Sequence, residues 1–145
     1  MNVLNSLDIS SSGLSAQRIR MNVISSNLAN INTTRTPEGG PYKRKDVVFA
    51  ASNENGLFKN ILNSSMDKKI SGVNVVGITE DNGEPLLKYD PDHPDADENG
   101  YVSMPNIKLM EEMVNMISAT RSYEAGVAAI KATRSMALKA LEIGR

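Results

Sequence analysis

The fold is decided by residues 105–143, which read PNIKLMEEMVNMISATRSYEAGVAAIKATRSMALKALEI. Apolar side chains recur there every seven residues, a spacing that places them on one stripe of a long helix and favours a left-handed supercoil with a partner. The stripe consists of Leu109, Met116, Tyr123, Ile130 and Ala137, flanked by Met113, Val127 and Leu141. We therefore expect a long C-terminal helix that packs lengthwise against another helix, rather than an ordinary bundle helix.

Small residues form a further column beside this stripe. They are Ala119, Gly126, Thr133 and Ala140. Because such side chains let another backbone approach closely, the column predicts neighbours on two sides of the helix. Ser103 is the expected N-cap, with Pro105 in the first turn and Gly144 at the C-terminal stop.

The N-terminal segment, residues 3–31, carries a second heptad pattern. One column consists of Leu7, Leu14, Met21 and Leu28, and the other of Val3, Ser10, Gln17, Ile24 and Ile31. The remaining surface is rich in Ser and Asn, and its only charged residues are Asp8, Arg18 and Arg20. A solvated helix face usually carries Glu and Lys, because Ser and Asn are weaker helix formers. This face is therefore expected to be covered by other protein.

The apolar seam is small relative to the chain entropy that the two terminal segments lose on folding. We therefore expect both ends to be largely disordered in a lone monomer and to fold when they meet other subunits.

Between the helices the apolar period shifts to two, which predicts a small β-rich insert of two to four strands and an α+β fold. Strands are expected at residues 42–49 and 73–78, with a hairpin turn at residues 81–83 that leads into a returning strand at 85–89. Asn55-Gly56 predicts another turn, followed by an apolar cluster of Leu57, Phe58, Ile61 and Leu62. The expected division is an N-terminal helix (1–34), an insert (35–103) and a C-terminal helix (104–145).

Composition excludes several classes of function. The 145 residues include no Cys, which excludes disulfides, Cys–zinc sites and Cys nucleophiles. The net charge of −1 and the aromatic content of 4% favour neither nucleic-acid binding nor an aromatic ligand pocket. No secretory signal or membrane-spanning run is recognisable. The basic triplet Lys43-Arg44-Lys45 is interpreted as a solvated strand edge or a contact to an acidic neighbour rather than a phosphate site.

One acidic segment, residues 90–100, invites a metal hypothesis. Asp95, Asp97, Asn99 and Gly100 match the first half of a calcium loop, but the position that needs a bidentate Glu is Asn106. A solvated turn stiffened by prolines is the preferred interpretation. The sequence contains no nucleophile motif that His93 could activate as a general base. We expect no catalytic residue, no metal and no cofactor, and therefore no enzyme.

Four stretches together carry a family resemblance: SSNLANINT (25–33), PYKRKDVVF (41–49), YDPDHPDA (89–96) and GYVSMPNIKLMEEMVNMISATRSYEA (100–125). They resemble the flagellar basal-body rod family, in the expected order and over nearly the whole chain. The loop from Thr33 to Pro41 is longer than in most rod and hook proteins, which suits a member of the proximal rod. The resemblance implies a structural subunit exported unfolded through the flagellar type III apparatus, without a cleaved signal, to a rod that spans the periplasm.

On this interpretation, the terminal helices assemble with other rod subunits into a helical axial structure, with no nucleic acid and no direct membrane insertion. The expected interface residues are Leu7, Leu14, Met21, Ile24, Asn27, Leu28, Asn30, Ile31, Leu109, Met113, Met116, Tyr123, Val127, Ile130 and Leu141. Asn27, Asn30 and Asn32 are expected to satisfy turn backbone or to bridge subunits. The alternative is a soluble coiled-coil adaptor or export chaperone, which predicts stable helical ends and a more charged outer face.

Overall fold

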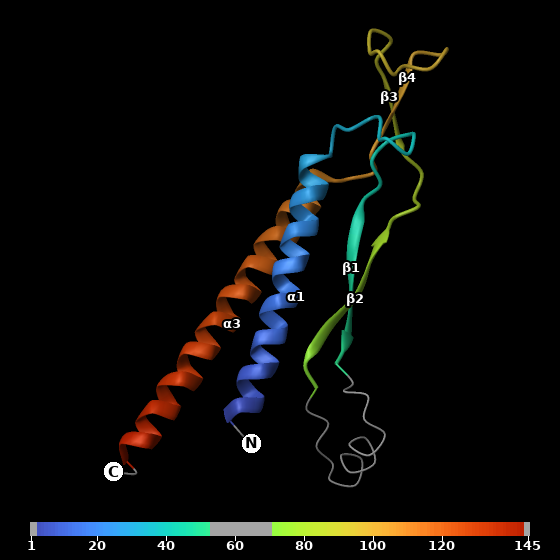
Figure 1. The fold of residues 1–145 in the computed structure, drawn as a ribbon. Helices are drawn as coiled ribbons and strands as arrows, with labels where there is room; N and C mark the ends of the chain where they lie inside the picture. The colour runs from blue at the N-terminus through green and yellow to red at the C-terminus, as the bar shows by residue number, and fades with distance from the viewer. Residues whose placement is uncertain (1–2, 53–70, 144–145) are drawn as a thin grey trace, which may run out of the picture. The chain divides into compact units, whose positions relative to one another are not determined.

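The computed structural model describes residues 3–52 and 71–143 and contains two helices with four strands between them in the chain (Figure 1). The elements are α1 (Val3–Ala29), β1 (Lys45–Ala51), β2 (Val73–Glu80), β3 (Leu86–Tyr89), β4 (Tyr101–Met104) and α3 (Leu109–Ile143). The α+β prediction is confirmed. The expected turn at Asn55-Gly56, the apolar cluster after it and the Gly144 stop lie outside the described residues.

The chain divides into two compact units, each with parts of both helices. The first unit comprises Met1–Arg18, Val48–Gly77 and Thr120–Arg145, and the second comprises Ile19–Val47 and Ile78–Ala119. Among the described residues, most buried side chains belong to the second unit. They are Val23, Ile24, Asn27, Val47, Val102, Pro105, Ile107, Glu112 and Ala119, whereas Ala16 belongs to the first unit. The three-part division expected from the sequence stays a prediction.

Two serines of helix α1 bond to the backbone of the helix itself. The hydroxyl of Ser10 donates to the carbonyl of Ser6 at 2.9 Å, and that of Ser12 donates to the carbonyl of Ile9 at 2.8 Å. The helix ends where Asn30 turns back, with its side-chain amide donating to the carbonyl of Ser26 at 2.9 Å. Asn30 thus satisfies turn backbone, one of the two roles expected of it.

Helix α3 begins later than the sequence suggested. It starts at Leu109, and Ser103 is not its N-cap but a residue of β4 that pairs with Leu87. The predicted position of Pro105 in the first turn is therefore wrong. Pro105 directly follows β4, where a residue without a backbone N–H removes no hydrogen bond from the ladder. Glu111 and Glu112 lie in its first turn, near the positive end of the helix dipole, where a negative charge is favourable.

The strands form two separate two-stranded sheets, β1–β2 and β3–β4. The N–H of Ser52 donates to the carbonyl of Gly72 and that of Asp81 to the carbonyl of Arg44, which requires β1 and β2 to be antiparallel. The predicted hairpin at residues 81–83 is wrong, because β2 pairs with β1 and not with β3. The seven residues of β1 offer a longer ladder than the four of β3.

The segment from Asp81 to Gly83 instead forms a bend between the two sheets, in which the carboxylate of Asp81 accepts the N–H of Gly83 at 2.8 Å. The strand predicted at residues 42–49 begins only at Lys45, because the N–H of Tyr42 is bound to the carbonyl of Thr33 within the preceding loop.

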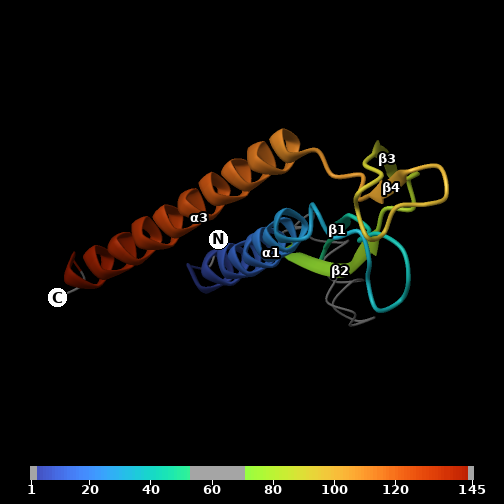
Figure 2. The same cartoon turned by 90° about the horizontal axis from the view of Figure 1, so that it is seen from above.

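The acidic segment connects β3 to β4 and is drawn in yellow in Figure 2. The carboxylate of Asp97 accepts the N–H groups of Asn99 and Tyr101, at 2.9 and 2.8 Å. Gly100 follows with φ of 80°, a left-handed conformation that glycine adopts without strain. The rings of Tyr89 and Tyr101 meet edge to face at 5.3 Å across the sheet. The segment is therefore a hydrogen-bonded turn, as predicted, but it leads into β4 and not directly into the long helix.

Candidate assembly surfaces

The residues expected at the interface differ widely in exposure. Ile24 and Asn27 are buried, whereas Leu109, Met113 and Leu141 are exposed. The others are half-buried: Leu7, Leu14, Met21, Leu28, Asn30, Ile31, Met116, Tyr123, Val127 and Ile130. Within one chain, some of these side chains are therefore covered by the chain itself, whereas others are exposed to solvent. Their role in contacts between subunits stays a prediction.

The small-residue column of α3 makes contact within the chain. Ala119 is completely buried in the second unit. In the first unit, a Cβ atom added to Gly126 would lie 2.8 Å from Cδ2 of Leu14, so α1 approaches the backbone of α3 closely there. Thr133 of the column is half-buried as well, whereas Ala140 is exposed.

The second unit contains a buried polar cluster, hereafter the polar joint, formed by Asn27, Tyr42, Arg44, Lys45 and Glu112. The side chain of Glu112 is 1% exposed and accepts hydrogen bonds from Nε of Arg44 at 2.8 Å and from Nδ2 of Asn27 at 3.2 Å. Asn27, 0% exposed, also donates to the carbonyl of Lys45 at 2.8 Å and accepts its N–H at 2.9 Å. The hydroxyl of Tyr42 donates to Oδ1 of Asn27 at 3.2 Å. The joint thus ties α1, the start of β1 and the start of α3 together.

The positive charge of Arg44 is balanced by neighbouring carboxylates. Burial alone would lower its pKa, but the hydrogen bond and negative charge of Glu112, followed by those of Asp46, raise the pKa above its ordinary value. Lys45 pairs with Glu80 at 3.4 Å, and Lys43 donates to Asn82 at 3.2 Å. The basic triplet therefore contacts acidic and polar neighbours, one of the two interpretations that the sequence allowed.

The start of α3 exposes a contiguous apolar surface, hereafter the α3 patch. It consists of Leu109, Met110, Met113, Val114 and Ile117, whose exposed fractions range from 46 to 72%. Large apolar side chains gathered on one exposed surface mark sites of association. The sequence pattern had assigned Leu109 and Met113 to the helix seam, and the structure places both on the exposed side.

The outer face of α1, hereafter the serine face, is exposed throughout. It consists of Asn5, Asp8, Ser11, Ser15, Arg18, Asn22, Ser25 and Ser26. The hydroxyl of Ser26 lies 3.3 Å from that of Tyr42, and all residues of the serine face are exposed in the described chain. The expectation that another protein covers this face stays a prediction.

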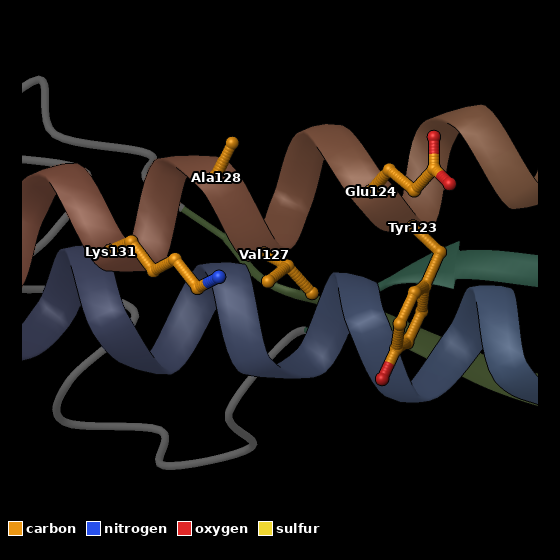
Figure 3. Close-up of a pocket in the computed structure, with 5 residues that line it drawn as sticks. All are labelled: Tyr123, Glu124, Val127, Ala128 and Lys131. Carbon is orange, nitrogen blue, oxygen red and sulfur yellow. The ribbon is translucent and has the colours of Figure 1, made fainter.

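A shallow groove lies on α3 in the first unit. It is lined by Tyr123, Glu124, Val127, Ala128 and Lys131. Figure 3 shows Tyr123, Val127 and Lys131 directed toward α1, whereas Glu124 and Ala128 lie on the opposite side of the α3 ribbon. The lining is almost entirely apolar between the two charged ends, so the groove suits the side of another helix better than a polar small molecule.

A second hollow, in the second unit, is polar. Its walls include Thr34, Arg35, Pro94 and Asp95. The hydroxyl of Thr34 donates to Asp95 at 2.8 Å, and Arg35 lies 4.0 Å from the same carboxylate. These contacts join the loop after α1 to the acidic turn.

Metal binding finds no geometric support in the described part of the chain. Residues 3–52 and 71–143 contain no group of three or more His, Asp or Glu side chains arranged to hold a metal ion. Asp97 uses its carboxylate to close the turn, and Nδ1 of His93 accepts the N–H of Asp95 at 3.1 Å. These side chains order the loop rather than forming a ligand set.

Comparison with known proteins gives a consistent result over the whole chain. Residues 7–35 match the family model described as flagella basal body rod protein, and residues 98–143 match that of the flagellar basal body rod FlgEFG protein C-terminal region. The flagellar basal-body rod protein FlgC of Bacillus subtilis is 49% identical and that of Borreliella burgdorferi is 46% identical, with 98–100% of those proteins and at least 99% of this chain covered. FlgC of Salmonella typhimurium is 41% identical over the full length of both chains. Neither described helix has an apolar stretch long enough to cross a membrane.

Proposed function

The chain belongs to the FlgC family of flagellar basal-body rod proteins, and on this premise we propose how it takes part in the rod. It is a structural subunit of the proximal rod in the flagellar basal body, and it assembles with other rod subunits. The terminal helices make these subunit contacts, and the insert joins them. A surface that contacts a different surface on the next subunit builds a helical structure when the contacts do not close into a ring.

The observation that carries this proposal is the α3 patch, five large apolar side chains exposed within nine residues of one helix. Burying such side chains contributes about 1.5–3 kcal/mol each. The serine face of α1 supports the same conclusion, because its small side chains allow another subunit to approach closely. In the assembled rod we expect both surfaces to be covered.

Other elements of the proposal follow from the family. The subunit is exported unfolded through the flagellar type III apparatus to the rod that spans the periplasm. Its role is architectural, so it needs no catalytic residue, no cofactor and no nucleic acid, and it does not insert directly into the membrane. The absence of Cys suits passage into an oxidising compartment.

Substitution of interface residues by Asp tests the proposal. Leu28→Asp, on the half-buried side of α1, and Val114→Asp, in the exposed α3 patch, should both block rod assembly without blocking synthesis. The readouts are swimming, the amount of the chain in whole cells and the amount in purified basal bodies. Asn74→Asp, at an exposed position of β2, is the control and should swim normally.

Val114→Asp is the stricter variant, because an exposed side chain can be replaced without disturbing the fold of the chain. Normal swimming by both Leu28→Asp and Val114→Asp would refute the assignment of the terminal helices as the assembly surface.

A further inference from the structure

The groove on α3 has the form of a helix-binding site. Residues four apart on a helix form parallel ridges, and the groove between two ridges receives a ridge of a partner helix. Here one ridge consists of Tyr123, Val127 and Lys131, and the other of Glu124 and Ala128. Glu124 and Lys131 stand at opposite ends of the groove, about 10 Å apart along the helix axis. Neither has an ion-pair partner among the described residues, so both charges are available to an incoming surface.

The serine face of α1 carries two charges at a matching separation. Asp8 and Arg18 are exposed and lie about 15 Å apart along the axis, with the small residues Ser11 and Ser15 between them. Helical geometry places all four on one narrow stripe of α1. As with Glu124 and Lys131, the described part of the chain supplies neither charge with an ion-pair partner.

We infer that the groove on α3 receives the serine face of α1 from a second copy of this chain, with the two helices antiparallel. This orientation places Arg18 of α1 opposite Glu124 and Asp8 opposite Lys131. The long Arg and Lys side chains span the difference of about 5 Å between the two separations. Ser11 and Ser15 lie over Val127 and Ala128, where their small size lets the helices pack closely. This inference rests on the proposed assembly function and specifies which two surfaces meet.

Charge selects the antiparallel orientation. In a parallel arrangement Asp8 would face Glu124 and Arg18 would face Lys131, and both pairs would repel. The remaining nearby charges are Arg121, one turn before Glu124, and Arg134, one turn after Lys131. The antiparallel helix places uncharged Asn22 opposite Arg121 and uncharged Asn5 opposite Arg134. The arrangement therefore pairs both charges of the groove and brings no like charges together.

Disulfide trapping tests the contact directly, because the chain has no native Cys. The double variant Ser11→Cys with Ala128→Cys is expressed in cells that lack the original gene copy, and basal bodies are isolated, mildly oxidised and separated on a non-reducing gel. The expected result is a ladder of crosslinked multimers. The control Ser25→Cys with Ala128→Cys moves the α1 thiol along the same face by about 21 Å and should give monomer.

This inference would be overturned if the cells were motile but their oxidised basal bodies contained the double variant only as monomer. The proposed function would then remain intact. Basal bodies without this chain would overturn both. A crosslink to a different rod protein would also overturn the inference, because it would identify another subunit as the occupant of the groove.

Charge exchange provides a second test that does not depend on thiol geometry. Asp8→Lys and Lys131→Asp should each reduce swimming, because each places like charges together in every subunit contact. The double exchange restores the pair with reversed polarity and should recover most of the parental swimming rate. Equal defects in the single and double variants would count against the pairing of these positions.

Discussion

Glu112 is a charged residue almost without contact to solvent, and its two partners determine its effect on stability. Arg44 and Asn27 both donate to its carboxylate. Removing this carboxylate leaves Arg44, a quarter exposed, with Asp46 at 3.5 Å as its remaining partner and takes an acceptor from Asn27. The loss of hydrogen bonds to a buried charged group costs about 1–3 kcal/mol. Glu111, its neighbour, is exposed and pairs with Lys108 at the surface.

We therefore predict that Glu112→Ala lowers the free energy of unfolding by about 1–3 kcal/mol, whereas Glu111→Ala changes it by about 0–1 kcal/mol. Urea denaturation followed by circular dichroism measures both variants. Equal effects of the two substitutions would show that the joint contributes no more than a surface ion pair.

The sequence singled out one residue of this site but not its partners. Asn27 was expected to satisfy turn backbone or to bridge subunits, and its side chain binds the main chain of Lys45 at the start of β1. The burial of Glu112 could not be predicted, because Glu111 and Glu112 are equally suited to the first turn of a helix. Which of them is buried depends on the rotational phase of α3 against α1, and that phase is set by the whole contact.

At the scale of elements, the close approach of α1 and α3 at Gly126 determines how much volume the contact tolerates. An Ala methyl group there would meet only the flexible tip of Leu14. Ala also favours a helix interior by about 1 kcal/mol relative to Gly. The two effects oppose each other.

Accordingly, Gly126→Ala should change the free energy of unfolding by less than about 1 kcal/mol, whereas Gly126→Leu should lower it by about 1–3 kcal/mol through overpacking. Gly13→Ala, with no atom within 4 Å of the new methyl group, is the control and should stabilise α1 by up to about 1 kcal/mol. Thermal unfolding of the three variants tests this order. A stable Gly126→Leu variant would mean that the helices separate easily at this point.

Helices and strands differed in how well the sequence predicted them. The long heptad patterns predicted both helices, because a repeated apolar spacing is a local property. The pairing of β2 with β1 rather than β3 is not local, since Asp81-Asn82-Gly83 is an equally good signal for a hairpin turn and for a bend. The pairing is decided by whether β1 or β3 is the better partner for β2, and β1 is the longer strand.

At the scale of the whole molecule, burial is uneven between the two units. Apart from Ala16, the buried side chains among the described residues belong to the second unit. Backbone amides exchange slowly where opening requires the loss of buried contacts. Each long helix therefore combines a well-covered part with a thinly covered part.

Hydrogen exchange of dilute chain should reflect this difference. We predict slow exchange in residues 19–29 and 109–119, and exchange faster by at least about tenfold in residues 5–15 and 125–140. Mass spectrometry of proteolytic fragments provides the measurement. Uniform strong protection along both helices would favour a finished monomer, as the adaptor alternative requires. The sequence predicted poorly self-supporting ends but not this division within each helix, because burial depends on tertiary contacts with the insert.

The polar joint also determines which of its positions can change during evolution. Asn27 binds the main-chain N–H and carbonyl of residue 45, atoms that every amino acid except proline supplies in full. The identity of the side chain at position 45 is therefore irrelevant to this contact, whereas the amide at position 27 has no substitute of the same shape. Among related chains, we therefore expect asparagine to be retained at position 27 while the residue at position 45 varies.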